Sequence, residues 1–375
     1  MSSSPQAESG LPSDRGGKDI GVFLPIANGG WIMSSNAPEL DGSYAYNRRS
    51  AILADELGLD FVLSMAKWRG YGGATGHWNV SLDAQILIAA LTEATQRVKL
   101  WTTVHTLLQN PAVTAKMMAT LDQVSGGRAG LNVVTGSYKG EFDQMGAWLE
   151  GVDHDQRYDL AAEWITAVKR LWREPSVTLD GTYIKLKDCQ SWPKPQSRPF
   201  LVCAGTSGRG MQFSLEEMDA IFLTGRDNED LGRVSRDVKA RAHAFGRSIK
   251  TYTMMTFVFG ETDAAAQAQA EHYRAGLDEG ALRGMMRAYG FLDAELGQEN
   301  AFVASARSSF MTPRLIGSPQ TITDQAISLM EQAELDGLML IFPDYVEGLH
   351  ILAEHVLPKI RAHFRPAQEA ISHAN

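Results

Sequence analysis

Short apolar runs recur along the chain and alternate with stretches in which apolar positions follow a helical period. The runs are almost continuously apolar rather than alternating, which is typical of strands that are covered on both faces. The pattern therefore predicts eight strands. They lie at residues 19–26, 60–65, 99–105, 128–136, 199–205, 220–225, 251–260 and 337–342.

Between these runs the apolar spacing predicts helices, of which five are clear. They lie at residues 46–58, 81–95, 111–127, 158–173 and 321–337. Pro111 near the start of the third and the Gly126–Gly127 pair at its end match the usual asymmetry of helix termini. Repeated strand–helix alternation indicates parallel strands with right-handed crossovers, and eight units favour closure into an α/β fold of the (β/α)8 TIM-barrel type. A doubly wound open sheet is the alternative.

Two segments exceed what a simple barrel needs. Residues 174–198, an insertion after the fourth barrel helix, contain a predicted hairpin whose turn is Asp180-Gly181. Residues 277–318 form a longer insertion between the seventh and eighth strands. Because loops of that length in compact domains are often covers over a site, we predict a lid there; a surface excursion without a catalytic part is the alternative.

We interpret residues 19–365 as a single barrel domain. Residues 1–18 are rich in Ser, Gly and Pro and are predicted to be a disordered tail, and residues 366–375 a C-terminal tail. The first 18 residues lack the apolar core of a signal peptide, and no run of 18 apolar residues occurs in the chain. The sequence therefore predicts neither secretion nor a transmembrane helix.

Composition narrows the class of function. The formal net charge is -9 and there is no run of Lys or Arg, so the chain carries no electrostatic footprint for nucleic acid or an anionic membrane. The two cysteines, Cys189 and Cys203, allow neither a disulfide framework nor a CxxC site, which favours a reducing cytoplasm. These features favour small-molecule chemistry in the cytoplasm.

Common catalytic motifs are absent. His350 and His355 are five apart, off the i, i+4 spacing of a zinc-binding HExxH helix, so we predict no metal site. Residues 205–209 end in Arg where a serine-hydrolase elbow needs Gly. The glycine-rich run at 204–210 is neither a P-loop nor a dinucleotide fingerprint.

Two polar residues lie inside apolar strands, near their carboxyl ends. Thr103 is in the third predicted strand and Asn132 in the fourth. A buried polar group without a partner costs about 1 to 3 kcal/mol, so either the protein or a ligand must satisfy each one. Active sites of TIM barrels lie at this end of the strands, which indicates a ligand role; a local hydrogen-bonding role is the alternative.

The chain resembles the bacterial luciferase-like flavin monooxygenases. The similar runs lie at residues 20–34, 60–73, 117–146 and 153–172, and contain S-G-G-R, N-x-V-T-G and E-x-x-x-M-G in that order. The resemblance covers about residues 19–365 and implies a (β/α)8 barrel. It also implies reduced FMN supplied by a separate NAD(P)H-dependent flavin reductase, O2 as co-substrate, and a flavin peroxide.

The same resemblance implies a set of site residues. Those expected to contact FMN are Ala66, Lys67, Asn132, Glu141, Arg157, Tyr158 and Ser207. Those expected to line the O2 pocket and to act in catalysis are Leu63, Thr103, Asn132 and Glu141. Arg157, Tyr158 and Ser207 fall near the starts of predicted helices, where N–H groups and the positive dipole end suit a phosphate.

The similarity is greatest to family members that open a pyrimidine ring, which implies oxidative cleavage of a C–N bond in a heterocycle such as uracil. Ser137, Tyr138 and His105 depart from those members. Riboflavin cleavage to lumichrome and sulfone or sulfonate oxidation therefore stay open, as does a flavin-binding protein without enzymatic activity.

Two further features bear on substrate and assembly. Trp68, Tyr71 and Trp78 either line a substrate site or pack as ordinary loop residues. The apolar helices at 81–95 and 111–125 are candidates for the interface of a homo-oligomer, a dimer or a tetramer, because family members pair through this region. Packing against the barrel is the alternative.

Overall fold

A computed structural model describes residues 17–292 and 301–365. Eight parallel strands close into a barrel, because β9 pairs with β8 on one side and with β11 on the other, and β11 pairs with β1. All eight strands predicted from the sequence are confirmed, and the alternative of an open sheet is wrong. The strands are β1 (Asp19–Phe23), β2 (Phe61–Ser64), β3 (Lys99–His105), β4 (Ala129–Val134), β7 (Phe200–Cys203), β8 (Ala220–Phe222), β9 (Lys250–Phe259) and β11 (Gly337–Ile341).

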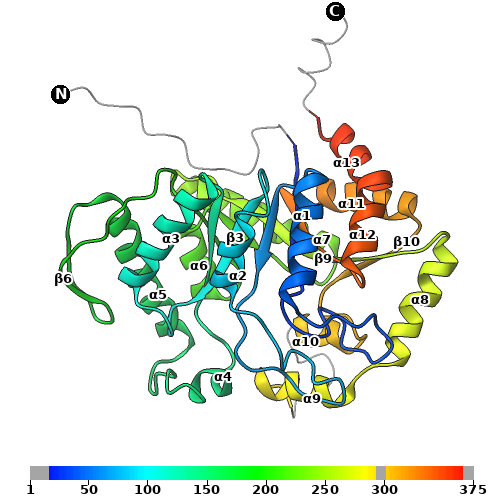
Figure 1. The fold of residues 1–375 in the computed structure, drawn as a ribbon, viewed down its shortest axis with the longest axis horizontal. Coiled ribbons are helices and arrows are strands. Elements are labelled where there is room, and N and C mark those ends of the chain that lie inside the picture. The colour runs from blue at the N-terminus through cyan, green and yellow to red at the C-terminus, as the bar shows by residue number, and fades with distance from the viewer. Residues whose placement is uncertain (1–16, 293–300, 366–375) are drawn as a thin grey trace, which may run out of the picture.

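Helices surround the barrel (Figure 1). The five helices predicted from apolar spacing are present, with ends that differ by up to a few residues. The helices of the barrel units, predicted or not, are α1 (Tyr44–Glu56), α2 (Ala84–Leu91), α3 (Pro111–Ser125), α5 (His154–Arg173), α6 (Gly208–Glu217), α7 (Asn228–Ala244), α8 (Asp263–Ala275) and α11 (Pro319–Gln332). The chain then continues through α12 (Tyr345–Ile351), the π-helix η1 (Leu352–Val356) and α13 (Leu357–His363). No helix within the described ranges is both long and apolar enough to cross a bilayer.

The predicted hairpin is confirmed. Strands β5 (Val177–Asp180) and β6 (Lys185–Cys189) pair antiparallel around the Asp180-Gly181 turn. The Glu163 carboxylate on α5 accepts hydrogen bonds from three successive backbone N–H groups of the turn, between 2.8 and 3.0 Å. The insertion is therefore tied to the barrel through α5.

The second insertion contains α9 (Glu279–Ala288), α10 (Ala301–Ala306) and β10 (Arg314–Gly317); residues 293–300, which the predicted lid includes, lie outside the described residues. Strand β10 was not predicted. It pairs parallel with the carboxyl-terminal half of β9, from Thr256 to Phe259, beyond the stretch of β9 that pairs with β8.

Aromatic rings fill the barrel interior. Phe61 on β2 stacks on Trp101 on β3, with ring centroids 3.9 Å apart, and Trp101 also lies against Phe200 on β7 and Tyr252 on β9. Rings from strands that are not neighbours can meet only across the interior, so this contact identifies the inward face of each strand. Gly130 on β4 leaves space for these rings, because a Cβ there would come within 2.2 Å of the Trp101 ring.

Candidate active site

Side-chain alternation places three of the predicted site residues on the inward face. Leu63 lies two residues beyond Phe61, Thr103 two beyond Trp101, and Asn132 two beyond Gly130, so all three point into the mouth of the barrel. All three are buried. The mouth is the carboxyl-terminal end of the strands, where TIM barrels carry their sites.

Thr103 and Asn132 are direct partners across β3 and β4. The Thr103 hydroxyl donates to the Ser64 carbonyl at 2.7 Å and accepts from the Asn132 amide nitrogen at 3.0 Å. Because the Asn132 amide donates through its nitrogen, its Oδ1 oxygen is left buried, with no hydrogen-bond partner within the described residues. A buried acceptor that the protein does not satisfy suits a ligand N–H donor.

His105, two residues beyond Thr103, adds a second acceptor. Its Nε2 atom lies 3.3 Å from the Ala66 carbonyl oxygen, so Nε2 carries the proton in the tautomer that makes this bond. Its Nδ1 atom is buried and has no partner in the described part of the chain. Burial lowers the pKa of His105, so the ring stays neutral. The imidazole also packs edge-on against the Phe142 ring, with ring centroids 5.1 Å apart.

Lys67 and Glu141 form a buried ion pair at the same mouth. Lys67 Nζ lies 3.2 Å from Glu141 Oε2, and the side chains are 7% and 4% exposed. Glu141, in the short helix α4 (Lys139–Asp143), also accepts the backbone N–H of Trp68 at 2.6 Å and of Arg69 at 3.3 Å. It therefore fixes the loop after β2 that carries Ala66 and Lys67.

Aromatic rings enclose the Lys67 ammonium. The Nζ atom lies 4.8 Å from the centroid of Tyr71, 5.0 Å from that of Tyr138 and 5.9 Å from that of Trp78. Burial lowers the pKa of Lys67, and the Glu141 charge opposes that shift. Tyr71 and Trp78 are therefore buried beside this ammonium, whereas Trp68 is 43% exposed; a role of these aromatic residues in binding substrate stays a prediction.

A second group of predicted residues gathers at the start of α6. Ser207 caps this helix by accepting from the Gly210 N–H at 3.2 Å. The hydroxyl of Tyr158, in the first turns of α5, lies beside the Ser207 and Thr135 side chains, and burial raises the pKa of Tyr158 to about 12. Since Thr135 directly follows β4, this group adjoins the Asn132 end of the mouth.

Arg157 lies apart from the hydrogen bonds of the other predicted phosphate-binding residues. Its Nη1 atom donates to the Val152 carbonyl at 3.3 Å, and its guanidinium lies 4.8 Å from the Trp148 ring centroid. The Nε atom is buried without a partner in the described ranges. Arg157 therefore neighbours Tyr158 in sequence, but within residues 17–292 and 301–365 its guanidinium makes no hydrogen bond or ion pair with the start of α6.

Tyr289 is a residue that sequence reasoning missed. It ends α9 in the second insertion, and the Tyr71 hydroxyl donates to its hydroxyl at 3.2 Å. No local pattern marks it, because the two tyrosines are 218 residues apart.

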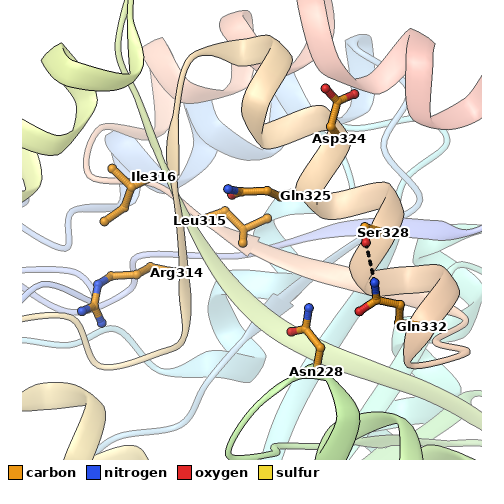
Figure 2. Close-up of a pocket in the computed structure, with 8 residues that line it drawn as sticks. All are labelled: Asn228, Arg314, Leu315, Ile316, Asp324, Gln325, Ser328 and Gln332. Atoms are coloured by element: carbon orange, nitrogen blue, oxygen red, sulfur yellow. Dashed lines mark hydrogen bonds between the residues drawn. The ribbon is translucent and has the colours of Figure 1, made fainter.

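One further feature lies away from the mouth. An open hollow of about 730 Å³ lies between β10, α11 and the first residue of α7, on the outside of the barrel (Figure 2). Its polar lining includes Asn228, Arg314 and Gln332 and none of the predicted site residues. Within residues 17–292 and 301–365, no group of three His, Cys, Asp or Glu side chains is placed to hold a metal ion.

A closed parallel barrel with buried polar side chains at the carboxyl ends of its strands defines an enzyme of the TIM-barrel class. Residues 19–336 match the family model described as luciferase-like monooxygenase, and the chain belongs to that family. It is a flavin-dependent monooxygenase, as the family and its named relatives indicate.

The curated relatives include pyrimidine monooxygenases. The chain is 36% identical over 351 residues to pyrimidine monooxygenase RutA of Methylobacterium radiotolerans, covering 92% of each chain. It is 34% identical over 361 residues to RutA of Rhizobium rhizogenes, covering 94% of this chain and 99% of that one.

Among solved structures, riboflavin lyase RcaE with modified FMN and substrate riboflavin superposes with a TM-score of 0.80 at 24% identity, covering 94% of this chain and 93% of that one. The long-chain alkane monooxygenase LadA superposes with a TM-score of 0.79 at 21% identity, covering 92% of each. These likenesses confirm the fold; at such identities they do not address the substrate.

Proposed function

We propose that this protein uses reduced FMN and O2 to cleave a C–N bond in a nitrogen heterocycle of the pyrimidine type. The observation that carries the proposal is the pair of buried acceptors, Asn132 Oδ1 and His105 Nδ1, beside the Thr103 hydroxyl. Flavin and pyrimidine rings both present N–H donors, so the mouth has the complementary chemistry. The identity to pyrimidine monooxygenases over most of the chain favours the same substrate class.

Two groups of side chains would hold the FMN. Ala66, Lys67, Asn132 and Glu141 lie at the barrel mouth, where the ring would be sheltered from water. Tyr158 and Ser207, with the N–H groups that begin α6, suit the phosphate, and Arg157 supplies a nearby positive charge.

When bound, reduced FMN supplies the electrons that activate O2, so that one oxygen atom enters the substrate and the other leaves as water. The protein's part is positional. Thr103 and Asn132 form a fixed, uncharged pair of hydrogen-bonding groups, with Leu63 as an apolar wall beside them. A pocket of this kind orients O2 and the ring and excludes bulk water.

The proposal includes two partners. No dinucleotide fingerprint occurs in the sequence, so a separate NAD(P)H-dependent reductase would supply the reduced FMN. The outer faces of α2 and α3 carry exposed apolar side chains, Ile86 at 69%, Val113 at 55% and Val124 at 50%. This surface would form the interface of a homo-oligomer, which sedimentation of wild-type protein and an Ile86→Lys variant would test.

The activity test uses purified protein, photoreduced FMN, O2 and one of three substrates: uracil, riboflavin or dimethyl sulfone. Uracil is expected to be consumed, with one atom from ¹⁸O2 in the product by mass spectrometry. Turnover of riboflavin or the sulfone alone would replace the proposed substrate, and no turnover of any would overturn the proposal.

A matched pair of variants tests the role of the pocket. Thr103→Val removes the hydroxyl that joins Ser64 and Asn132, and is expected to divert oxygen from product to hydrogen peroxide by about 10-fold or more. Thr102→Val changes the neighbouring residue, which is equally buried but faces outward by alternation. Equal coupling in the two variants would refute the role given to Thr103.

A further inference from the structure

The helix α9 is docked on the loop that follows β2. The Asp278 carboxylate, which caps α9 by accepting from the Ala281 N–H at 3.0 Å, also accepts the Thr75 N–H at 2.7 Å and the Thr75 hydroxyl at 2.8 Å. In the middle of α9, a Cβ on Gly284 would come within 1.9 Å of the Tyr71 carbonyl oxygen. Two separate points therefore hold α9 against this loop, at the end of the molecule that also carries α4 (Figure 1).

This docking places Tyr289 beside Tyr71, at the mouth of the barrel. Tyr289 directly follows α9, and its hydroxyl accepts from the Tyr71 hydroxyl at 3.2 Å, with ring centroids 6.4 Å apart. The Ser137 side chain lies beside this hydroxyl, where it opposes the rise in the pKa of Tyr289 that burial causes. Three hydroxyl groups from the β2 loop, the β4 loop and the second insertion thus form one cluster.

The cluster adjoins the groups of the candidate active site. The Tyr71 ring centroid lies 4.8 Å from Lys67 Nζ, and Ser137 is two residues beyond Thr135, whose side chain lies beside the Tyr158 hydroxyl. Burial raises the pKa of both Tyr71 and Tyr289, so both phenols stay protonated at neutral pH. Each hydroxyl can therefore donate or accept a hydrogen bond without carrying charge.

We propose that Tyr289 is a specificity-determining residue, and that its hydroxyl, with those of Tyr71 and Ser137, binds the polar edge of the heterocycle. The edge of a pyrimidine-type ring alternates N–H donors and carbonyl acceptors. Uncharged hydroxyls match both kinds of group, whereas a charged side chain would match only one. This inference rests on the proposed function and deepens it, because it names the groups that recognise the substrate.

The main test compares Tyr289→Phe with Arg283→Gln, using uracil as the substrate and photoreduced FMN. Tyr289→Phe keeps the ring and removes the hydroxyl. Arg283 lies on the exposed face of the same helix, where its side chain is 64% exposed. A site that loses one of its hydrogen bonds to a substrate discriminates less well, so kcat/KM for uracil is expected to fall roughly 10- to 100-fold in Tyr289→Phe, mainly through KM, and to stay within about two-fold in Arg283→Gln.

Two further readouts separate recognition from a structural role. FMN affinity and Tm of Tyr289→Phe are expected to match those of wild type, since the ring that packs is retained. Tyr71→Phe is expected to raise KM in the same direction, and the double variant to lose less than the product of the two single losses, because the hydroxyls act as one hydrogen-bonded unit.

The failures of the two proposals differ. If wild type consumes uracil and Tyr289→Phe does so with unchanged KM, the role of Tyr289 is overturned and the proposed function stands. If wild type consumes no heterocycle, the proposed function fails, and this inference falls with it whatever the variants do. A Tyr289→Phe protein with lowered FMN affinity or Tm would overturn the inference in favour of a structural role.

Discussion

Glu141→Gln replaces the carboxylate of the buried ion pair with a neutral amide of the same shape. The amide oxygen can still accept from the Trp68 N–H, which now lies 2.6 Å from the carboxylate. What the substitution removes is the negative charge 3.2 Å from Lys67 Nζ. Lys67 would then be a buried cation without a counter-ion.

The size of the effect follows from burial and from the surrounding rings. Removing one partner of a buried ion pair typically costs about 3 to 5 kcal/mol. The three rings between 4.8 and 5.9 Å from Nζ offset part of this loss through cation–π attraction, which lies at roughly 0.5 to 2 kcal/mol per favourable contact. We therefore expect Glu141→Gln to lower the free energy of unfolding by about 3 kcal/mol at pH 7.

The loss is expected to depend on pH. Burial lowers the pKa of Lys67 and the Glu141 charge raises it, so the native pKa falls further in Glu141→Gln. Between that native pKa and the ordinary value of 10.5, the unfolded chain binds a proton that the native state does not, and stability rises with pH. The deficit of the variant relative to wild type is thus largest near pH 7 and shrinks as the pH approaches about 10.

Urea unfolding followed by circular dichroism, at two pH values about three units apart, measures this difference. Asp180→Asn is the matched control, because it removes a carboxylate from an exposed ion pair with Lys185 and is expected to change nothing measurable. Lys67→Met combined with Glu141→Gln is expected to recover most of the loss. An equal deficit at both pH values, or a double variant no more stable than Glu141→Gln, would refute the reasoning.

Two further predictions follow from single contacts. Gly284→Ala would stabilise an ordinary helix interior, but here the new Cβ would meet the Tyr71 carbonyl, so we expect Tm to fall, with a cost of about 1 to 3 kcal/mol; a rise in Tm would contradict the docking of α9. Tyr158→Phe removes the hydroxyl that lies beside Thr135 and Ser207, and isothermal titration is expected to show FMN bound roughly 5- to 10-fold more weakly; unchanged affinity would remove Tyr158 from the phosphate site.

The barrel could be predicted because its strands are buried on both faces, which leaves continuous apolar runs in the sequence. Helix ends were less accurate, because the capping residues precede the apolar period. The capping box of Asp153 and Gln156, for example, starts α5 at His154, four residues before the predicted start. Strand β10 was missed because three of its four residues are only half-buried, so no continuous apolar run marks it in the sequence.

The candidate site was predictable only in part. Thr103 and Asn132 stand out as polar residues within apolar strands, and neighbouring parallel strands bring them together. The Lys67–Glu141 pair joins the loop after β2 to the helix α4 across 74 residues. Local periodicity carries no information about such a contact. For this reason the pairing of Lys67 with Glu141, and the position of Tyr289 beside Tyr71, became visible only in the structure.

The side chains described above at the barrel mouth share one electrostatic property: in the described residues, each is uncharged or paired near neutral pH. Burial keeps His105 neutral by lowering its pKa, and keeps Tyr71 and Tyr289 neutral by raising theirs, while Lys67 is balanced by Glu141. An unpaired acid at this position would donate protons to reduced oxygen and release hydrogen peroxide.

The ratio of product formed to O2 consumed is therefore expected to stay constant between about pH 7 and 8.5, because His105, Tyr71 and Tyr289 do not change their charge there: the pKa of His105 lies below its ordinary value of 6.5 and those of the tyrosines lie above 10. Simultaneous measurement of product and O2 across this range checks the expectation. His105→Lys would place a titrating cation in the mouth, and its ratio is expected to vary with pH. A ratio that varies in wild type as it does in this variant would show that a titrating group of the native mouth controls coupling.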